Sequence, residues 1–196
     1  MFPSYDDWKK LDIFHPKDTY QDWTTKEWWE YYYCKYFYAE TVCKAKHILE
    51  IGVRLGYSAY SFLSNKYCET YTGIDIQKPL DGGMEFKTFD WVKEKVFSKF
   101  PNVKTELIEG NTQIDAWPSK KYDLIHIDGD HSTAGALHDC KEAWDILLPG
   151  GLMIVDDYTF IPEVTQAVEE FLHLKNMPRI IGYSKRGDCL IFRPYV

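Results

Sequence analysis

The stretch HILEIGVRLGYS, which begins at His47, constrains the fold of this 196-residue chain most strongly. Its first five residues are mainly apolar and include two isoleucines, which is typical of a buried strand. Gly52 ends this run, Gly56 follows four residues later, and residues 57–63 have the pattern of a helix. A strand, a glycine loop and a helix form the first half of a βαβ unit. Such a loop lets a ligand approach the backbone, and the helix start offers N–H groups to an anion.

Three kinds of ligand loop fit this stretch to different degrees. A P-loop requires GxxxxGK[ST], which the sequence lacks. A dinucleotide fingerprint requires GxGxxG, and Arg54 stands at its middle glycine, where a side chain would crowd a pyrophosphate. The third pattern is ExGxxxGxS, in which Glu50 places a carboxylate near the end of the strand. An ordinary turn with structural glycines remains the alternative to all three.

Composition excludes several classes of function. The formal net charge of −7 does not favour a nucleic-acid partner. We expect no membrane association, because no apolar run approaches the ~20 residues of a membrane span and the N-terminus has no signal core. The five cysteines lack metal-binding spacing, which indicates reduced thiols and a cytoplasmic location.

Alternating strand and helix patterns run through the rest of the chain. Strands are expected at 47–51, 69–76, 102–109, 122–128, 152–156, 179–183 and 188–193, and helices at 26–46, 57–63, 86–100, 132–148 and 159–172. This order predicts a doubly wound α/β fold with a seven-stranded, mostly parallel sheet that ends in an antiparallel hairpin. We divide the chain into an N-terminal arm and helix, residues 1–46, and an α/β domain, residues 47–196.

The helix expected at 26–46 contains the run WWEYYYCKYFY. Its aromatic side chains recur at three- and four-residue spacing, so the helix can pack on the sheet. The alternative is a lid whose rings cover an acceptor pocket, because tyrosine and tryptophan combine a large contact area with a polar group. Both roles are compatible if they use different faces of the helix.

Polar residues end the successive strands of the expected sheet. In doubly wound sheets ligands bind at the carboxyl ends of the strands, so these residues are the candidates for chemistry. Asp75 ends the second strand, 23 positions after Gly52, where a carboxylate can accept both ribose hydroxyls of a nucleoside. The third strand ends in Gly110, Asn111 and Thr112.

Three aspartates stand at the ends of the fourth and fifth strands. Asp128 lies in HIDGDH, and Asp156 and Asp157 lie in VDDY. If these strands are neighbours, the carboxylates converge and repel one another unless a cation neutralises them. Oxygen ligands at this density suit Mg²⁺ or Mn²⁺, although Asp157 could instead cap a turn.

The ordered series EIG with GYS, GIDI, EGNT, HIDGDH, LPGG and VDDY resembles the class I S-adenosylmethionine-dependent methyltransferases. Within that class it is similar to the metal-dependent O-methyltransferases of the catechol and macrocin types. The resemblance implies a cofactor site made of Glu50, Gly52, Gly56, Tyr57, Ser58, Asp75, Gly110, Asn111, Thr112 and Asp128. It also implies that Asp128, Asp156 and Asp157 are the metal ligands.

The resemblance implies Asp130 as the general base, because the macrocin type carries an aspartate at this position. The catechol type uses a nearby lysine, and this sequence has none between Asp123 and Cys140. His131 is a second candidate, since an imidazole titrates near neutral pH, or it only starts a helix. His126 lies inside a strand and is expected to be a hydrogen-bonded core residue.

These features predict an S-adenosylmethionine-dependent enzyme that methylates a hydroxyl of a small acceptor with the help of Mg²⁺ or Mn²⁺. Two other functions remain open, an NAD-dependent oxidoreductase on a similar sheet and a cofactor-binding module without turnover. The sequence names no acceptor. It leaves a homo-oligomer possible.

Overall fold

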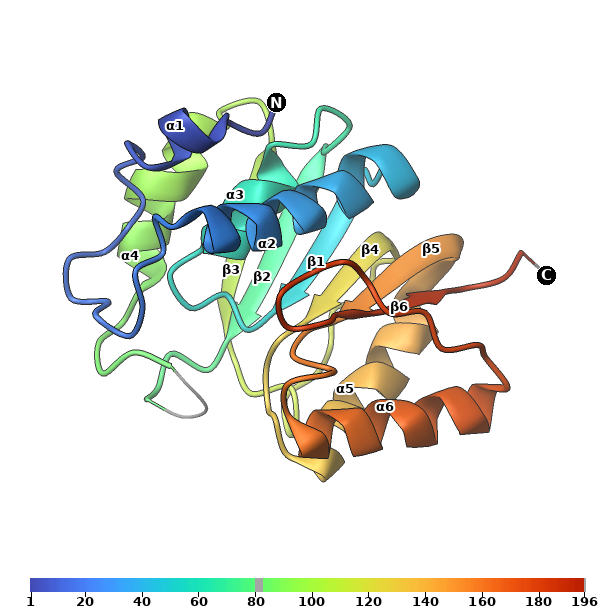
Figure 1. Ribbon diagram of the computed structural model, residues 1–196. Coiled ribbons are helices and arrows are strands. Elements are labelled where there is room, and N and C mark those ends of the chain that lie inside the picture. The colour runs from blue at the N-terminus through green and yellow to red at the C-terminus, as the bar shows by residue number, and fades with distance from the viewer. Residues whose placement is uncertain (80–82, 196) are drawn as a thin grey trace.

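The computed structural model describes residues 1–79 and 83–195 and contains an α/β sheet flanked by helices (Figure 1). Within these residues the sheet has six strands in the order β3-β2-β1-β4-β5-β6. They are β1 (His47–Ile51), β2 (Thr70–Asp75), β3 (Lys104–Glu109), β4 (Tyr122–Ile127), β5 (Leu147–Val155) and β6 (Cys189–Phe192). All neighbouring strands are parallel except β5 and β6. The predicted fold class is confirmed.

The helices cover both faces of the sheet (Figure 1). Those before β4 are α1 (Tyr5–Trp8), α2 (Lys26–Phe37), the π-helix η1 (Tyr38–Val42), α3 (Tyr57–Leu63), α4 (Phe89–Trp91), the π-helix η2 (Val92–Val96) and the 3₁₀-helix η3 (Phe97–Lys99). Those after β4 are α5 (Thr133–Ile146) and α6 (Pro162–Lys175). The first group packs on one face of the sheet, and α5 with α6 packs on the other. This follows from the strand order: β2 and β3 are added on one side of β1, and β4 and β5 are then added on the opposite side of β1.

The central strand β1 shows why the sheet is buried on both faces. Successive strand residues point to opposite faces, so Ile48 joins the hydrophobic core beneath α2 and α3, while Leu49 joins the core beneath α5 and α6. The order of the strands reverses between β1 and β4. The carboxyl ends of these strands therefore form the switch point at which doubly wound proteins bind ligands.

The expected seventh strand is absent from the described residues. In the expected region 179–183, Ile181 forms a single antiparallel bridge with Cys189, and the backbone returns through a short turn. Ile180 and Ile181 are exposed, so this segment has no apolar face that packing could hold as a strand. The antiparallel edge of the sheet is consequently supplied by β6.

Other boundaries also differ from expectation: the helix expected at 159–172 spans Pro162–Lys175, and the one expected at 86–100 is divided into α4, η2 and η3. The long helix expected at 26–46 ends as an α-helix at Phe37 and continues as the π-turn η1. The strand expected at 152–156 begins five residues earlier, at Leu147, since α5 ends at Ile146 and the chain extends through the LPGG segment. Gly150 adopts φ +80° there, and its N–H donates to the carbonyl of Arg193 at 2.7 Å.

The N-terminal arm shares the core of the α/β part. Phe2, Trp8, Ile13 and Trp23 are buried in the same cluster as the sheet face beneath α2. The five cysteines, all of which the structure describes, are free thiols. None of the helices within residues 1–79 and 83–195 has the length and apolar character needed to cross a bilayer.

Candidate active site

Gly52 brings the glycine loop against the end of β4. It has φ +84°, and a Cβ added there would lie 1.8 Å from the carbonyl oxygen of Asp128. Its N–H donates to the carbonyl of Ile74 at 2.9 Å. The loop is therefore held where β1, β2 and β4 end, and only glycine fits. Gly56, with φ +80°, precedes the first residue of α3 and lines neither of the cavities described below.

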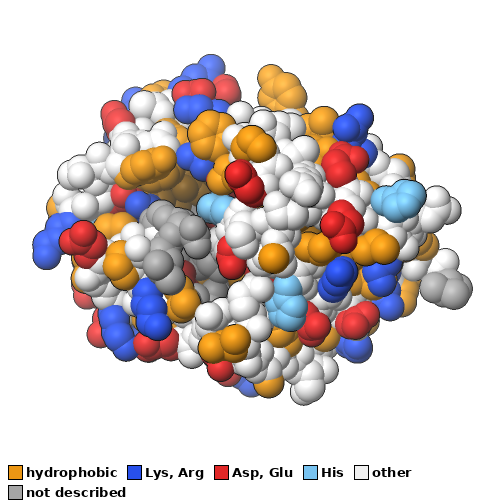
Figure 2. Space-filling view, turned by 90° about the horizontal axis from the view of Figure 1, so that it is seen from below, with side chains coloured by type: hydrophobic (Ala, Val, Ile, Leu, Met, Phe, Trp, Pro, Cys, Tyr) orange, Lys and Arg blue, Asp and Glu red, His pale blue; other side chains and the backbone are white. Residues whose placement is uncertain are grey.

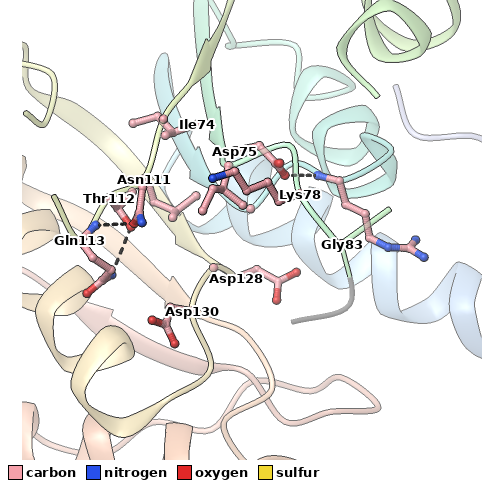
Figure 3. Close-up of a pocket in the computed structure, with 15 residues that line it drawn as sticks. Ile74, Asp75, Lys78, Gly83, Asn111, Thr112, Gln113, Asp128 and Asp130 are labelled. Atoms are coloured by element: carbon pink, nitrogen blue, oxygen red, sulfur yellow. Dashed lines mark hydrogen bonds between the residues drawn. The ribbon is translucent and has the colours of Figure 1, made fainter. Parts of the chain in front are cut away.

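A first cavity, of about 190 Å³, opens beside this loop (Figure 3). Its lining includes the predicted residues Gly52, Asp75, Gly110, Asn111, Thr112 and Asp128. They come from the carboxyl ends of β1, β2, β3 and β4, which the parallel register aligns at one edge. The structure thus brings most of the predicted cofactor residues around one space.

The Asp75 carboxylate is held in one orientation within this cavity. It accepts hydrogen bonds from the backbone N–H of Arg54 at 2.8 Å and of Gln77 at 2.6 Å. The Gln77 side-chain amide donates to the same carboxylate at 3.0 Å. These donors fix an anionic acceptor at the end of β2, where a ribose hydroxyl pair was expected.

Glu50 lies elsewhere. Its side chain is fully buried on the face of the sheet that α2 and α3 cover. It lines neither cavity. The Tyr71 hydroxyl donates to it, and His126 Nδ1 lies 3.0 Å away across the β1–β4 pair. His126 is a hydrogen-bonded core residue, as expected. Any influence of Glu50 on the cofactor must pass through the strand it supports.

A second cavity, of about 370 Å³, adjoins the first and shares Gly52, Arg54 and Asp128 with it. Its walls are largely aromatic and come from the arm, α2 and the segment after β5: Tyr20, Trp23, Trp28, Tyr31, Tyr32 and Phe160. Tyr57 and Ser58 also line it. Figure 2 shows a hollow on this end of the molecule that hydrophobic, acidic and histidine side chains surround.

Two candidate bases adjacent in sequence face different cavities. Asp130 lines the first cavity, and its carboxylate accepts the N–H of Ser132 at 2.8 Å at the start of α5. His131 lines the second cavity, with Nε2 3.2 Å from Oδ1 of Asp128. The carboxylates of Asp128 and Asp130 lie apart in Figure 3. The geometry therefore places the imidazole, rather than Asp130, beside the aromatic walls.

Asp156 and Asp157 are both paired with cationic side chains that the sequence interpretation did not include. Lys35 Nζ lies 3.0 Å from Asp156 Oδ2, and the Tyr31 hydroxyl donates to the same carboxylate. Asp157 has φ +56°, and both of its carboxylate oxygens accept from Arg186, at 2.9 and 2.8 Å.

Lys35 is fully buried, and a second carboxylate, Asp188, lies 3.5 Å from its Nζ. Burial opposes its charge, but Asp156 and Asp188 hold the pKa of Lys35 above its usual value. Burial raises the pKa of Asp188 to about 7, and the nearby Asp156 adds to that rise. The sequence did contain a sign that Lys35 is buried, since its spacing places it on the same helical face as Trp28, Tyr31 and Tyr32.

Residues 49–158, more than half of the chain, match a family described as a methyltransferase domain. The chain belongs to this family. It is therefore an S-adenosylmethionine-dependent methyltransferase, which confirms the class indicated by the ordered motifs and favours methyl transfer over the NAD-dependent alternative. No curated protein matches the sequence.

Solved structures with the same fold include ligand complexes. The methyltransferase PaMTH1 from Podospora anserina, bound to SAH, has a TM-score of 0.64 at 18% identity over 99% of this chain and 89% of that one. The O-methyltransferase from Bacillus cereus, in complex with SAH, has 0.56 at 20% over 83% and 79%. TomG from Streptomyces achromogenes, in complex with SAM, has 0.56 at 16% over 84% and 79%. At these identities the likeness concerns the class I fold.

The first cavity of this methyltransferase fits the cofactor of its class. It offers the oriented Asp75 carboxylate, a backbone that approaches closely at Gly52, and polar loop residues at Asn111 and Thr112. The Asp75 carboxylate matches the ribose of the cofactor, the close backbone at Gly52 matches the part of the cofactor that must pass the glycine loop, and the polar loop residues match the nucleobase at the far end.

The acidic residues of the methyltransferase fit a divalent ion less well. Among the described residues, ligand atoms within 4.8 Å of one another occur in two sets, His126 with Asp128 and Asp156, and Asp128 with His131 and Asp157. Neither set combines the three aspartates predicted as ligands. Asp156 and Asp157 already contact Lys35 and Arg186, so an ion would meet side-chain cations at both places.

Proposed function

We propose that this methyltransferase transfers the methyl group of S-adenosylmethionine to a hydroxyl oxygen of a small acceptor. One observation carries the proposal: the cofactor cavity and the aromatic cavity meet at Gly52, Arg54 and Asp128. A donor in the first cavity and an acceptor in the second would face each other across this shared wall. His131 lies beside it.

The cofactor is assigned to the first cavity. S-adenosylmethionine, when bound, supplies a methyl group on a positively charged sulfonium. Asp75 binds the ribose hydroxyls, Asn111 and Thr112 border the adenine, and Gly52 lets the remainder of the molecule reach the second cavity. Tyr57 and Ser58 line the path beyond Gly52.

The acceptor is assigned to the second cavity. Its aromatic walls favour a flat molecule, because rings stack on rings and exclude water. The acidic and basic side chains at the inner end, Asp128, Asp157 and Arg186, supply polar contacts for a hydroxyl group. A small hydroxylated aromatic compound matches this combination, as does a sugar hydroxyl presented on an apolar ring face.

His131 is assigned as the general base. It accepts the proton of the acceptor hydroxyl at a ring nitrogen, and the Asp128 carboxylate at 3.2 Å stabilises the imidazolium that forms. The protein thereby holds the deprotonated oxygen in line with the methyl group, and this positioning accounts for most of the rate gain. Asp130 is assigned to the cofactor side, because it lines that cavity.

A metal-dependent form of the same reaction is the second candidate. The set of Asp128, His131 and Asp157 favours it, because two carboxylates and an imidazole lie within 4.8 Å of one another. A bound Mg²⁺ or Mn²⁺ would lower the pKa of an acceptor hydroxyl. The ion would have to displace Arg186 from Asp157, so no step above depends on it.

Methyl transfer is tested with the purified full-length protein, S-adenosylmethionine and a panel of phenols, catechols and sugar alcohols. We expect at least one acceptor to yield a methyl ether and S-adenosylhomocysteine in equal amounts, measured by mass spectrometry. Tight binding of S-adenosylhomocysteine without turnover on the panel would support a non-catalytic module. Methylation at nitrogen or carbon would contradict the assignment to oxygen.

A further inference from the structure

We propose that two side-chain cations, Lys35 and Arg186, take the place of a divalent ion in the acidic site, so that methyl transfer by this chain needs no added metal. The proposal rests on the proposed function and concerns how its acceptor hydroxyl is bound and activated. Four buried or half-buried carboxylates gather at this end of the sheet, from Asp128, Asp156, Asp157 and Asp188. Such a group is stable only with nearby positive charge or with a proton on some of its members.

Lys35 provides the first positive charge. Its ammonium lies 3.0 Å from Asp156 and 3.5 Å from Asp188, and its side chain is fully buried. The remaining oxygen of Asp156 accepts the N–H of Asp157 at 2.9 Å. Because removing a partner from a buried ion pair is costly, Lys35 is a permanent counterion of Asp156.

Lys35 also obstructs the first candidate ligand set. That set consists of His126, Asp128 and Asp156, and the His126 atom beside Asp156 is Nε2, 3.6 Å from Oδ2, since Nδ1 lies 3.0 Å from Glu50. The Lys35 ammonium lies 3.2 Å from the same Nε2 atom. A divalent ion bound there would be in direct contact with a buried ammonium, and the repulsion would oppose binding.

Arg186 provides the second positive charge. Its guanidinium contacts both oxygens of Asp157, and it is stacked near two rings, 5.3 Å from that of Trp28 and 4.7 Å from that of Phe160. Its carbonyl accepts from the backbone and the hydroxyl of Thr159, at 3.2 and 2.8 Å. Backbone, rings and carboxylate all hold this arginine at the site.

The position of Arg186 explains what the second cation does. It lines the aromatic cavity together with His131 and Asp157. A guanidinium there stabilises negative charge that develops on the acceptor oxygen, which is the contribution that a metal ion makes in other enzymes. Arg186 would therefore lower the pKa of the acceptor hydroxyl while His131 takes its proton.

Metal binding tests the proposal independently of turnover. Chelator-treated wild-type protein is titrated with Mn²⁺ and observed by electron paramagnetic resonance, and we expect no saturable binding. Arg186→Gln removes the charge and frees Asp157, so this variant should gain Mn²⁺ binding, and the double variant with Asp157→Asn should lose it again. In the same titration Arg186→Lys, which keeps the charge, and Arg179→Gln, an exposed arginine paired with Glu169, should show no saturable Mn²⁺ binding.

Turnover provides the second measurement. Wild-type activity should be unchanged in excess chelator, whereas Arg186→Gln should lower kcat by a factor on the order of 10–10³, as for a lost charge-stabilising group. Mn²⁺ should partly restore that variant. Saturable Mn²⁺ binding by the wild type, loss of its activity in chelator, or an Arg186→Gln protein that folds but gains no Mn²⁺ site would each overturn the proposal. An absence of any methyl transfer would instead refute the proposed function, and the Mn²⁺ titrations would still decide whether the cations occupy the site.

Discussion

Nε2 of His131 lies 3.2 Å from Oδ1 of Asp128, whereas the carboxylate of the intervening Asp130 turns away to accept the N–H of Ser132. The imidazole and Asp128 both line the aromatic cavity, and Asp130 does not. The turn that links β4 to α5 therefore separates the two candidate bases, with Asp130 at the cofactor cavity and His131 at the aromatic cavity, while Asp128 lines both.

The first prediction separates the two candidate bases. His131→Gln should lower kcat by a factor on the order of 10²–10⁴, the usual contribution of a general base, and leave the affinity for S-adenosylhomocysteine unchanged. Asp130→Asn should weaken cofactor binding more than it lowers kcat, because Asp130 lines the cofactor cavity. Kinetics and calorimetry measure the two effects. A large loss of kcat in Asp130→Asn alone would return the role of base to Asp130.

The second prediction concerns the cofactor. Asp75→Asn should weaken S-adenosylhomocysteine binding about 10–100-fold, because a hydrogen bond to a charged group is worth about 1.5–3 kcal/mol. Asp145→Asn, at an exposed position on α5, is the matched control and should bind normally. Gly52→Val is a poor probe, since its side chain would collide with the backbone of Asp128 and destabilise the fold. Calorimetry that finds equal affinity in wild type and Asp75→Asn would exclude Asp75 from the ribose site.

The third prediction concerns the arm. The Arg54 guanidinium binds both oxygens of Asp18 at 2.7 Å, while its backbone N–H holds Asp75. Ligand in the cofactor cavity should therefore slow hydrogen exchange in residues 10–25. Asp18→Asn should reduce that protection, and Asp6→Asn, in an exposed pair with Lys9, should not. Strong protection of this segment in the unliganded protein would show that the arm is already fixed.

The fourth prediction concerns stability. Lys35→Met leaves Asp156 and Asp188 buried without their cation, and it should lower the free energy of unfolding by about 3–5 kcal/mol. Lys26→Met, which removes an exposed pair on the same helix, should change it by less than about 0.5 kcal/mol. Urea denaturation measures both values. Adding Asp188→Asn to Lys35→Met should recover part of the loss, and a further loss would contradict the pairing.

The fifth prediction concerns pH. Asp139 lies on α5, and its carboxylate accepts a hydrogen bond from the side-chain amide of Gln113. Burial raises the pKa of Asp139 to about 6. The folded state then holds this proton more tightly than the unfolded chain, so ionisation costs stability as pH rises from about 4 to 6, by about 3 kcal/mol in total. Asp139→Asn should therefore be more stable than wild type at pH 8, with the advantage vanishing below pH 4. Parallel unfolding curves at all pH values would show that Asp139 titrates normally.

Strand ends were the predictable part of this site. Asp75, Asp128 and Asp156 each end or follow a strand, and the parallel register of β2, β1, β4 and β5 brings those ends together. Local pattern is enough for this result, because an apolar run and its first polar residue are adjacent in the sequence. The boundaries of β5 were less predictable, since the start of the strand depends on long-range contacts: Leu147 pairs with Tyr122 of β4, and Gly150 and Gly151 are hydrogen-bonded to Arg193.

Long-range partners were not predictable in the same way. Lys35 precedes Asp156 by 121 residues and meets it only when α2 packs on the sheet. Arg186 was expected in a hairpin turn, and in the fold it contacts Asp157 and lies beside the rings of Trp28 and Phe160. The sequence therefore showed the clustered carboxylates but not their counterions, which lie in distant segments. For this reason the cluster suggested a metal ion.

The aromatic cavity is assembled from residues before the family match, within it and after it, the last being Phe160, Ile161 and Arg186. Its floor, at Gly52 and Asp128, lies within the family match at 49–158, but the walls at Tyr20, Trp23 and Trp28 come from the chain before it. The floor cannot change freely, because the backbone at Gly52 touches that of Asp128. Exchange of the wall residues Tyr20, Trp23 and Trp28 should therefore redirect this enzyme to other acceptors while the floor stays fixed, as long as Lys35, which lies in the same N-terminal part, remains to neutralise Asp156.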